Sequence, residues 1–260
     1  MTVTSDTARL PLLLTTLRLP TVAKLWPAIG QTADTEGWPA ARTLATLLEH
    51  EVAERAARRI QRHLLEARLP PGKTLDTFDF AAAPVISRAR VAALAEGDSW
   101  LAMGTNILLF GTPGVGKTHL AAALGHALVE AGYRVLFART GDLVQQLQTA
   151  RQELRLAGAI EKLDKYHLLV LDDLSYVQKS QAETSVLFEL ISARYERRSI
   201  LITANQPFGT WDTIFPDPAM TVAAIDRLVH HAVILEMNID SYRRKTAQAR
   251  SAESPVDRSS

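Results

Sequence analysis

The chain contains no cysteine in its 260 residues, and aromatic side chains make up only 6% of it. Without cysteine, disulfide bonds and cysteine-ligated metal centres are excluded. No apolar run approaches the roughly 18 residues that a membrane-spanning helix requires, so we expect no membrane partner. Residues 1–7 lack the basic and then apolar layout of a signal peptide. We therefore expect a cytoplasmic protein.

Charge is nearly balanced, with a formal net charge of +1, but it is unevenly distributed. Residues 1–73 hold ten Lys and Arg against seven Asp and Glu, whereas residues 74–240 hold 14 against 19. Residues 241–260 are basic again, with five against two. A mildly acidic centre between two basic ends permits contact with nucleic acid through those ends.

The first part of the chain has a helical pattern throughout. Helices are predicted over residues 8–19, 21–35 and 39–69, with Pro27 and Gly30 disturbing the second. In the third, apolar residues recur at i, i+3 and i+4 spacing. They are Leu44, Leu47, Leu48, Val52, Ala56 and Ile60. The breaker sequence at residues 70–72 then predicts the end of a helical domain that covers residues 1–72.

A cluster of arginines follows in the second half of the third predicted helix. Its members are Arg55, Arg58, Arg59 and Arg62. One interpretation is contact with the phosphate backbone of DNA. The other is a solvated helix face on which Glu51, Glu54 and Glu66 offer partners at i, i+4 spacing. The sequence leaves both interpretations open.

From residue 74 onward, strand patterns alternate with helix patterns. The predicted strands are 106–110, 133–138, 167–171, 199–203 and 232–236. This alternation favours an α/β fold in which helices cover both faces of a parallel sheet. We assign residues 73–245 to this second domain. Residues 246–260, rich in Ser, Ala and charge, are predicted to be disordered.

The segment Gly111–Thr118 reads GTPGVGKT and lies between a predicted strand and a predicted helix. This is the pattern of the phosphate-binding P-loop. Its glycines allow the backbone N–H groups to approach a phosphate chain closely. Lys117 is expected to reach the β- and γ-phosphates, and the Thr118 hydroxyl to bind Mg²⁺. ATP and Mg²⁺ are therefore the predicted cofactors.

Polar residues end two further predicted strands. Asp172 and Asp173 follow an apolar run, where the first can hold the Mg²⁺ shell and the second can orient water. Asn205 could bind the γ-phosphate or the water, or simply form a turn. Arg227 lies in an apolar helix and could be solvated, paired within the chain, or offered to a partner's γ-phosphate.

Four stretches together resemble AAA+ ATPases, and are most similar to the clade of DnaC helicase loaders and IstB transposition helper ATPases. They are Thr77–Phe80, Gly111–Thr118, Leu168–Leu174 and Arg194–Asn205. Trp211, Asp226–His231 and Ser241–Arg243 also look like IstB, and Leu12–Pro20 fits that family's helical N-terminal domain. The likeness covers about residues 8–244. It implies a bacterial protein with an AAA+ P-loop NTPase core behind a small all-helical domain.

The resemblance also implies roles for individual residues. Nucleotide-binding residues are Gly111, Thr112, Pro113, Gly114, Val115, Gly116, Lys117, Thr118 and His119, with Phe78 and Phe80 near adenine. The metal ligands are Thr118 and Asp172. Asp173 takes the place of the usual catalytic glutamate, which makes slow hydrolysis an expectation, and Asn205 matches sensor 1. Arg227 matches the arginine finger that acts on the ATP of a neighbouring subunit, and Arg243 is a candidate for sensor 2.

The function that this resemblance implies is an ATP-dependent helper for insertion-sequence transposition. Such an ATPase would form a homo-oligomer with ATP sites between subunits, bind double-stranded DNA and activate an integrase-type transposase. Two alternatives stay open. One is a DnaC-like loader of a replicative helicase. The other is a module that binds DNA or a partner and has a purely structural nucleotide site.

Overall fold

The computed structural model describes residues 3–174, 181–206, 211 and 217–237. By their internal contacts the residues form two compact units, Met1–Arg62 and His63–Ser260, and each is described here by itself. Arg243 and the predicted tail over residues 246–260 lie outside the described residues. Within the described ranges, no helix is both long and apolar enough to cross a bilayer.

The first unit consists of helices, as predicted. They are α1 (Val3–Thr16), α2 (Pro20–Glu36) and α3 (Ala40–Ala67), the last of which continues into the second unit. Pro20 occupies the first position of α2, where its fixed φ suits a helix start. Leu14, Val22 and Leu47, one from each helix, form a small buried cluster. The helix predictions are confirmed, and α2 continues through Pro27 and Gly30.

The apolar face of α3 is only partly buried. Leu47 is 3% exposed, whereas Leu44 is 58% exposed and Val52 is 67% exposed. The periodicity therefore identified the helix correctly, but it did not identify which apolar residues join the core.

Among the residues that the structure describes, the second unit is built around five parallel strands in the order β2-β3-β4-β1-β5. The strands are β1 (Asn106–Gly111), β2 (Val135–Arg139), β3 (Leu168–Asp172), β4 (Ser199–Ala204) and β5 (Ala232–Met237). Each predicted strand is confirmed to within two residues. All residues of β1, β3 and β4 are buried, which explains why these strands read as continuous apolar runs.

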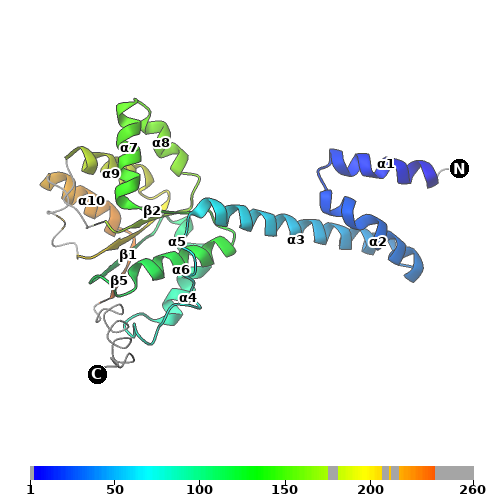
Figure 1. Ribbon diagram of the computed structural model, residues 1–260, viewed down its shortest axis with the longest axis horizontal. Helices are drawn as coiled ribbons and strands as arrows, with labels where there is room; N and C mark the ends of the chain where they lie inside the picture. The colour runs from blue at the N-terminus through cyan, green and yellow to red at the C-terminus, as the bar shows by residue number, and fades with distance from the viewer. Residues whose placement is uncertain (1–2, 175–180, 207–210, 212–216, 238–260) are drawn as a thin grey trace, which may run out of the picture. The chain divides into compact units, whose positions relative to one another are not determined.

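Helices cover both faces of this sheet (Figure 1). On one face lies α6 (Lys117–Glu130), with α4 (Arg88–Glu96) packed against it and the short α5 (Asp98–Ala102) nearby. On the other face lie α7 (Thr140–Gln152), α9 (Gln181–Arg194) and α10 (Pro218–Val229). The remaining helix, α8 (Leu156–Leu163), packs against α7. The predicted α/β fold class is confirmed.

Strand register brings the predicted site residues to one edge of the sheet. Phe110 pairs with Ala204, and Leu171 pairs with Ile202. One residue further along, the β3 strand ends at Asp172 beside Thr203, and Asn205 follows β4 beside the start of the P-loop. Because parallel strands share a direction, their carboxyl ends form a common edge where ligands bind.

Candidate functional site

The P-loop connects the end of β1 to the start of α6 through backbone conformations that favour glycine. Gly111, Gly114 and Gly116 have φ values of 152°, 88° and 101°. A Cβ atom on Gly111 would lie 2.5 Å from the carbonyl oxygen of Met237. Any larger residue at position 111 must therefore displace the backbone of β5.

The amino end of α6 opens onto a cavity. Gly116 is the N-cap of this helix and provides no side chain to bond its first N–H groups. Those groups have no intrahelical acceptor, and the helix dipole adds partial positive charge at the same place. An anion such as a phosphate is the matching ligand.

Lys117 is the first residue of α6 and is buried. Its Nζ donates hydrogen bonds to the carbonyl oxygens of Gly111, at 2.7 Å, and Thr112, at 2.9 Å. The ammonium group is thus held against the loop that would surround a phosphate chain.

Thr203, near the end of β4, bonds to the side chain of Asp172, the last residue of β3, and to the backbone of Asp173. Its hydroxyl donates to Oδ1 of Asp172 at 2.7 Å and accepts from the backbone N–H of Asp173 at 2.8 Å. Asn205 Nδ2 donates to Oδ1 of Asp173 at 3.3 Å. Asp172 is buried, and Thr140 Oγ1 donates to its carbonyl oxygen at 3.0 Å. These contacts hold Asp172 and Asp173 in place; Asp173 lines the cavity, whereas Asp172 is not among its lining residues.

The backbone of Asp173 has φ = 64°, in the left-handed region. Asp and Asn tolerate this region better than most residues that have a side chain. The short acidic residue therefore suits this backbone position, where the resemblance led us to expect glutamate.

Besides Lys73, Ala82 and Ala83, which line the cavity, sequence reasoning missed Thr203. The only signal was a hydroxyl-bearing residue in the last buried positions of an apolar strand. Its function as a connector depends on the register between β3 and β4, which one strand's sequence does not encode.

The cavity between the P-loop and these strand ends has a volume of about 430 Å³. It is lined by Lys73, Thr77, Phe78, Asp79, Ala82, Ala83, residues 113–119, Asp173, Thr203 and Asn205. The P-loop, Asp173 and Asn205 are thus brought together around one space. Of the two phenylalanines expected near adenine, Phe78 lines the cavity. Phe80 packs edge to face on Phe78, with ring centroids 4.8 Å apart, and is not among the lining residues.

His119 joins the P-loop helix to the segment that precedes the sheet. Its Nε2 lies 3.1 Å from Thr77 Oγ1 and 3.3 Å from the carbonyl oxygen of Thr74. Burial, with a smaller contribution from the charge of Lys73, lowers the pKa of His119, although the Thr74 carbonyl acts in the opposite direction. A neutral imidazole follows at neutral pH, so this residue adds shape and hydrogen bonding rather than charge.

Arg227 lies at the opposite end of the sheet from the cavity. It is in the last turn of α10, and the backbone N–H of Asn106, the first residue of β1, donates to the carbonyl oxygen of His231 just after that helix. The guanidinium of Arg227 covers the ring of Phe188 at 4.8 Å. At about 3.3 Å per residue, β1 separates this end of the sheet from the P-loop by roughly 16 Å. Arg227 is therefore not brought to the nucleotide cavity of its own chain.

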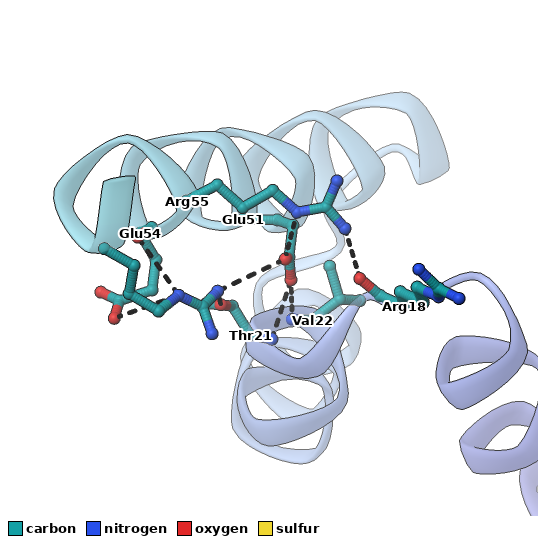
Figure 2. Close-up of polar contacts among 7 residues, drawn as sticks. Arg18, Thr21, Val22, Glu51, Glu54 and Arg55 are labelled. Atoms are coloured by element: carbon teal, nitrogen blue, oxygen red, sulfur yellow. Dashed lines mark hydrogen bonds and ion pairs between the residues drawn. The ribbon is translucent and has the colours of Figure 1, made fainter. Parts of the chain in front are cut away.

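In the first unit, Glu51 organises half of the arginine cluster (Figure 2). This carboxylate is 2% exposed and accepts hydrogen bonds from the backbone N–H groups of Thr21, at 2.8 Å, and Val22, at 3.1 Å. Arg55 Nε donates to it at 2.8 Å. Burial raises the pKa of this carboxyl, but the hydrogen bonds from Val22, Arg55 and Thr21 more than compensate and leave it below its ordinary value.

The arginines of the cluster differ in their surroundings. Arg55 also donates to the carbonyl oxygen of Arg18, and Arg58 forms longer ion pairs with Glu51, at 3.7 Å, and Glu54, at 3.9 Å. The partners predicted at i, i+4 spacing are thus confirmed for two of the three glutamates. Glu66 instead binds Arg134 at 2.7 Å. An open hollow beside them is lined by Val52, Arg55, Ala56, Arg58, Arg59 and Arg62.

Known proteins share both the sequence and the fold. The chain matches the model of the IstB-like ATP binding protein family over residues 12–250. It is 69% identical over 244 residues to a Sinorhizobium fredii protein whose name describes an insertion sequence ATP-binding protein, covering 94% of this chain and 82% of the relative. A similarly named relative from Geobacillus stearothermophilus is 37% identical, with coverages of 87% and 90%. AMPPCP-bound DnaA from Aquifex aeolicus shares the fold with a TM-score of 0.56 at 19% identity, over 73% of this chain and 57% of that one. The predicted fold, a parallel sheet that carries a P-loop, is confirmed.

Proposed function

The chain belongs to the IstB-like ATP binding protein family, and we propose that it hydrolyses ATP as a helper for insertion-sequence transposition. The observation that carries the ATPase proposal is the cavity that joins the open amino end of α6 to Asp173 and Asn205, which follow β3 and β4. One side of this cavity suits a phosphate chain, and the other suits a metal ion and a water molecule.

In the proposed reaction, water attacks the γ-phosphorus of ATP and ADP leaves. Lys117 moves from its loop carbonyls to the β- and γ-phosphate oxygens, where its charge stabilises the transition state. Asp173 orients the attacking water by accepting its hydrogen bond. Asn205, already bonded to Asp173, holds that carboxylate in place.

Mg²⁺ fits the oxygen atoms that this site offers. The Thr118 hydroxyl and the Asp172 carboxylate are hard ligands of the kind that Mg²⁺ prefers, and few protein ligands suffice when phosphates and water complete the shell. Thr203 fixes the orientation of Asp172 through its 2.7 Å hydrogen bond. When bound, the ion would neutralise charge that develops on the phosphate oxygens.

Arg227 supports the proposal that ATP sites are completed between subunits. Its position at the amino end of the sheet excludes contact with the γ-phosphate in its own chain, as described above. An arginine supplied by a second copy would stabilise the transition state in trans. We therefore propose a homo-oligomer that ATP stabilises.

Steady-state phosphate release with ATP, Mg²⁺ and duplex DNA tests the ATPase proposal. Lys117→Ala and Asp172→Ala should each abolish turnover, while Arg227→Ala should lower it with nucleotide affinity retained. Mixing Arg227→Ala with Lys117→Ala subunits should restore part of the turnover, because some interfaces then combine intact halves. If turnover is the same in the wild type, Lys117→Ala and Asp172→Ala, the ATPase proposal fails and a purely structural nucleotide site remains.

For DNA contact, the surroundings of the arginine cluster favour two of its members. All four arginines line the open hollow, but Arg55 and Arg58 also form ion pairs with Glu51. We propose that Arg59 and Arg62 contact phosphates of double-stranded DNA. Replacing both with alanine should flatten the dependence of log K on log salt by about one unit per lost contact.

The matched control is Arg90→Ala in the second unit, an exposed arginine of α4, which should leave the salt slope unchanged. Unchanged affinity and slope in the Arg59→Ala, Arg62→Ala double variant would assign the cluster to a solvated helix face. Tight binding to a replicative helicase hexamer, with none to duplex DNA, would favour the loader alternative.

The names of the relatives support the transposition context, since both describe insertion sequences. We propose that the DNA-bound oligomer recruits and activates an integrase-type transposase. Co-purification of the transposase with the ATP-bound, DNA-bound protein, and its loss with Lys117→Ala, tests this step.

A further inference from the structure

A cluster of metal-ligating side chains lies at the amino end of the sheet, away from the nucleotide cavity. It consists of Glu196, in the turn between α9 and β4, and of His230 and His231, between α10 and β5. One ligand atom from each lies within 4.8 Å of the other two. Glu196 Oε1 is 3.6 Å from His230 Nδ1 and 3.8 Å from His231 Nε2. All three side chains are about half exposed, so an ion can reach them from solvent.

The distances between these ligand atoms are close to the distances between ligand atoms around a bound zinc ion. Zinc bonds to imidazole nitrogen and carboxylate oxygen are about 2.0–2.2 Å long. Tetrahedral geometry then places neighbouring ligand atoms roughly 3.4 Å apart. The two Glu–His distances need to shorten by only a few tenths of an ångström, which side-chain rotation can provide.

Two buried polar residues hold the backbone segments that carry the cluster. Asn106 donates from Nδ2 to the carbonyl oxygen of Leu228 and accepts from the N–H of Ile200, which fixes the end of α10 beside the start of β4. The fully buried Arg194 donates to the carbonyl oxygens of Tyr166 and Ser199, which fixes the turn that contains Glu196. The backbone segments that carry the three ligands are thus held in place by buried residues before any ion binds.

We infer that Glu196, His230 and His231 form a binding site for a divalent first-row transition ion, of which Zn²⁺ is the representative. Two imidazoles and one carboxylate favour such ions over Mg²⁺, which prefers oxygen ligands alone. Three protein ligands leave a further coordination position for water. The ion would connect the α9–β4 turn to the α10–β5 junction, three residues beyond Arg227.

Tyr195 competes with the ion, because its hydroxyl also forms a hydrogen bond with Glu196. The hydroxyl of Tyr195 lies 2.7 Å from Nδ1 of His230, the same nitrogen that faces Glu196. Binding requires these hydrogen bonds to break. Tyr195→Phe should therefore retain the site and bind the ion at least as tightly as the wild type.

The test is calorimetric titration of Zn²⁺ into the tag-free, full-length protein in a buffer that contains Mg²⁺, with Co²⁺ absorption spectra to report the ligand geometry. We expect one Zn²⁺ per chain. Glu196→Gln, His230→Ala and His231→Ala should each weaken Zn²⁺ binding by about 10- to 100-fold or more. A loss of about 10- to 100-fold is typical when a residue that only supports a metal ligand is replaced. His50→Ala, which removes an exposed histidine of α3, is the matched control and should leave the affinity unchanged.

Circular dichroism of each variant separates loss of a ligand from loss of the fold, and Glu196→Gln is the least disruptive change. Zinc binding of equal strength in wild type, Glu196→Gln and the two histidine variants would overturn the inference. Binding that falls equally in His50→Ala would also overturn it. The titration requires neither ATP nor DNA, so its outcome is independent of the proposed ATPase function.

Discussion

The amino ends of α2 and α6 both present N–H groups that favour an anion, but the two ends differ in where that anion comes from. At the start of α2, the N–H groups of Thr21 and Val22 donate hydrogen bonds to the buried carboxylate of Glu51. At the start of α6, the N-cap is Gly116, and the helix opens onto a cavity lined by the P-loop. Both sites favour an anion. The chain supplies that anion itself in the first unit, and we propose that ATP supplies it in the second.

The cations beside these two helix ends differ in the same way. Arg55 is bonded to the carboxylate that caps α2, so its charge is used within the fold. Lys117 donates to the neutral carbonyl groups of Gly111 and Thr112, so the loop holds its charge beside the space where a phosphate chain would lie. An internal anion makes a helix end structural, and a glycine cap with a nearby cation makes it a binding site.

Replacing the cation beside each helix end should show the largest difference between α2 and α6. Lys117→Ala should lower ATP turnover by at least about 100-fold, since a preorganised charge at the transition state contributes on this scale. Arg55→Ala should leave turnover unchanged. Steady-state phosphate release measures both. Equal turnover in wild type and Lys117→Ala would contradict the proposal that the amino end of α6 acts in ATP hydrolysis.

Removing the internal anion should affect stability instead. Glu51→Ala should destabilise the first unit by about 2–4 kcal/mol, because it leaves two N–H groups and one arginine without their buried partner. Hydrogen exchange at the Thr21 and Val22 amides measures this locally in the full chain. The control is the exposed Glu54→Ala, with an expected cost under about 1 kcal/mol. Equal protection in both variants would contradict a structural cap.

Acid should weaken the α2 cap with a predictable sign. The pKa of Glu51 is lower in the folded protein than its ordinary value of 4.5. Its contribution to stability is therefore complete above that value and is lost as pH falls through the lower folded pKa. Hydrogen exchange at Thr21 and Val22, corrected for intrinsic rates, should accelerate over this acid range. In Glu51→Gln this acid-dependent acceleration should be smaller; an identical pH profile would exclude Glu51 as its source.

The smallest effect is expected at Arg58. Its ion pairs with Glu51 and Glu54 are 3.7 and 3.9 Å long, and its side chain is about half exposed. Solvent screens such pairs, so Arg58→Ala should cost only about 0.2–1 kcal/mol. Denaturant unfolding of the full chain measures this. A cost as large as that of Glu51→Ala would show that the cap depends on Arg58 as well.

Much of the fold was predictable because its signals are local. The strands β1, β3 and β4 are buried on both faces, so their sequences are continuous apolar runs. The P-loop requires glycine at positions with positive φ, and this requirement is visible in the residues themselves. The resemblance to IstB is confirmed by the family match. The assigned roles of Asp173, Asn205 and Arg227 stay predictions.

Other features depend on contacts between distant parts of the chain. Thr203 joins the Asp172 carboxylate to the backbone N–H of Asp173 because β4 lies beside β3 in one particular register. Glu51 caps a helix that begins 31 residues earlier, and nothing near position 51 in the sequence indicates this. Leu44 and Val52 follow the same apolar period as Leu47 but remain exposed, because periodicity describes a helix face and not its neighbours.

The sequence by itself determined the α/β class, the helical first part, the P-loop and the family, because composition, periodicity and glycine positions are properties of short segments. Only the tertiary structure decided which charges serve the fold and which face an open cavity. The reason is physical: whether a helix end, a carboxylate or an arginine is satisfied depends on atoms brought within about 3 Å of it. Residues far apart in the chain, such as Glu196 and His231, become neighbours only when the sheet assembles.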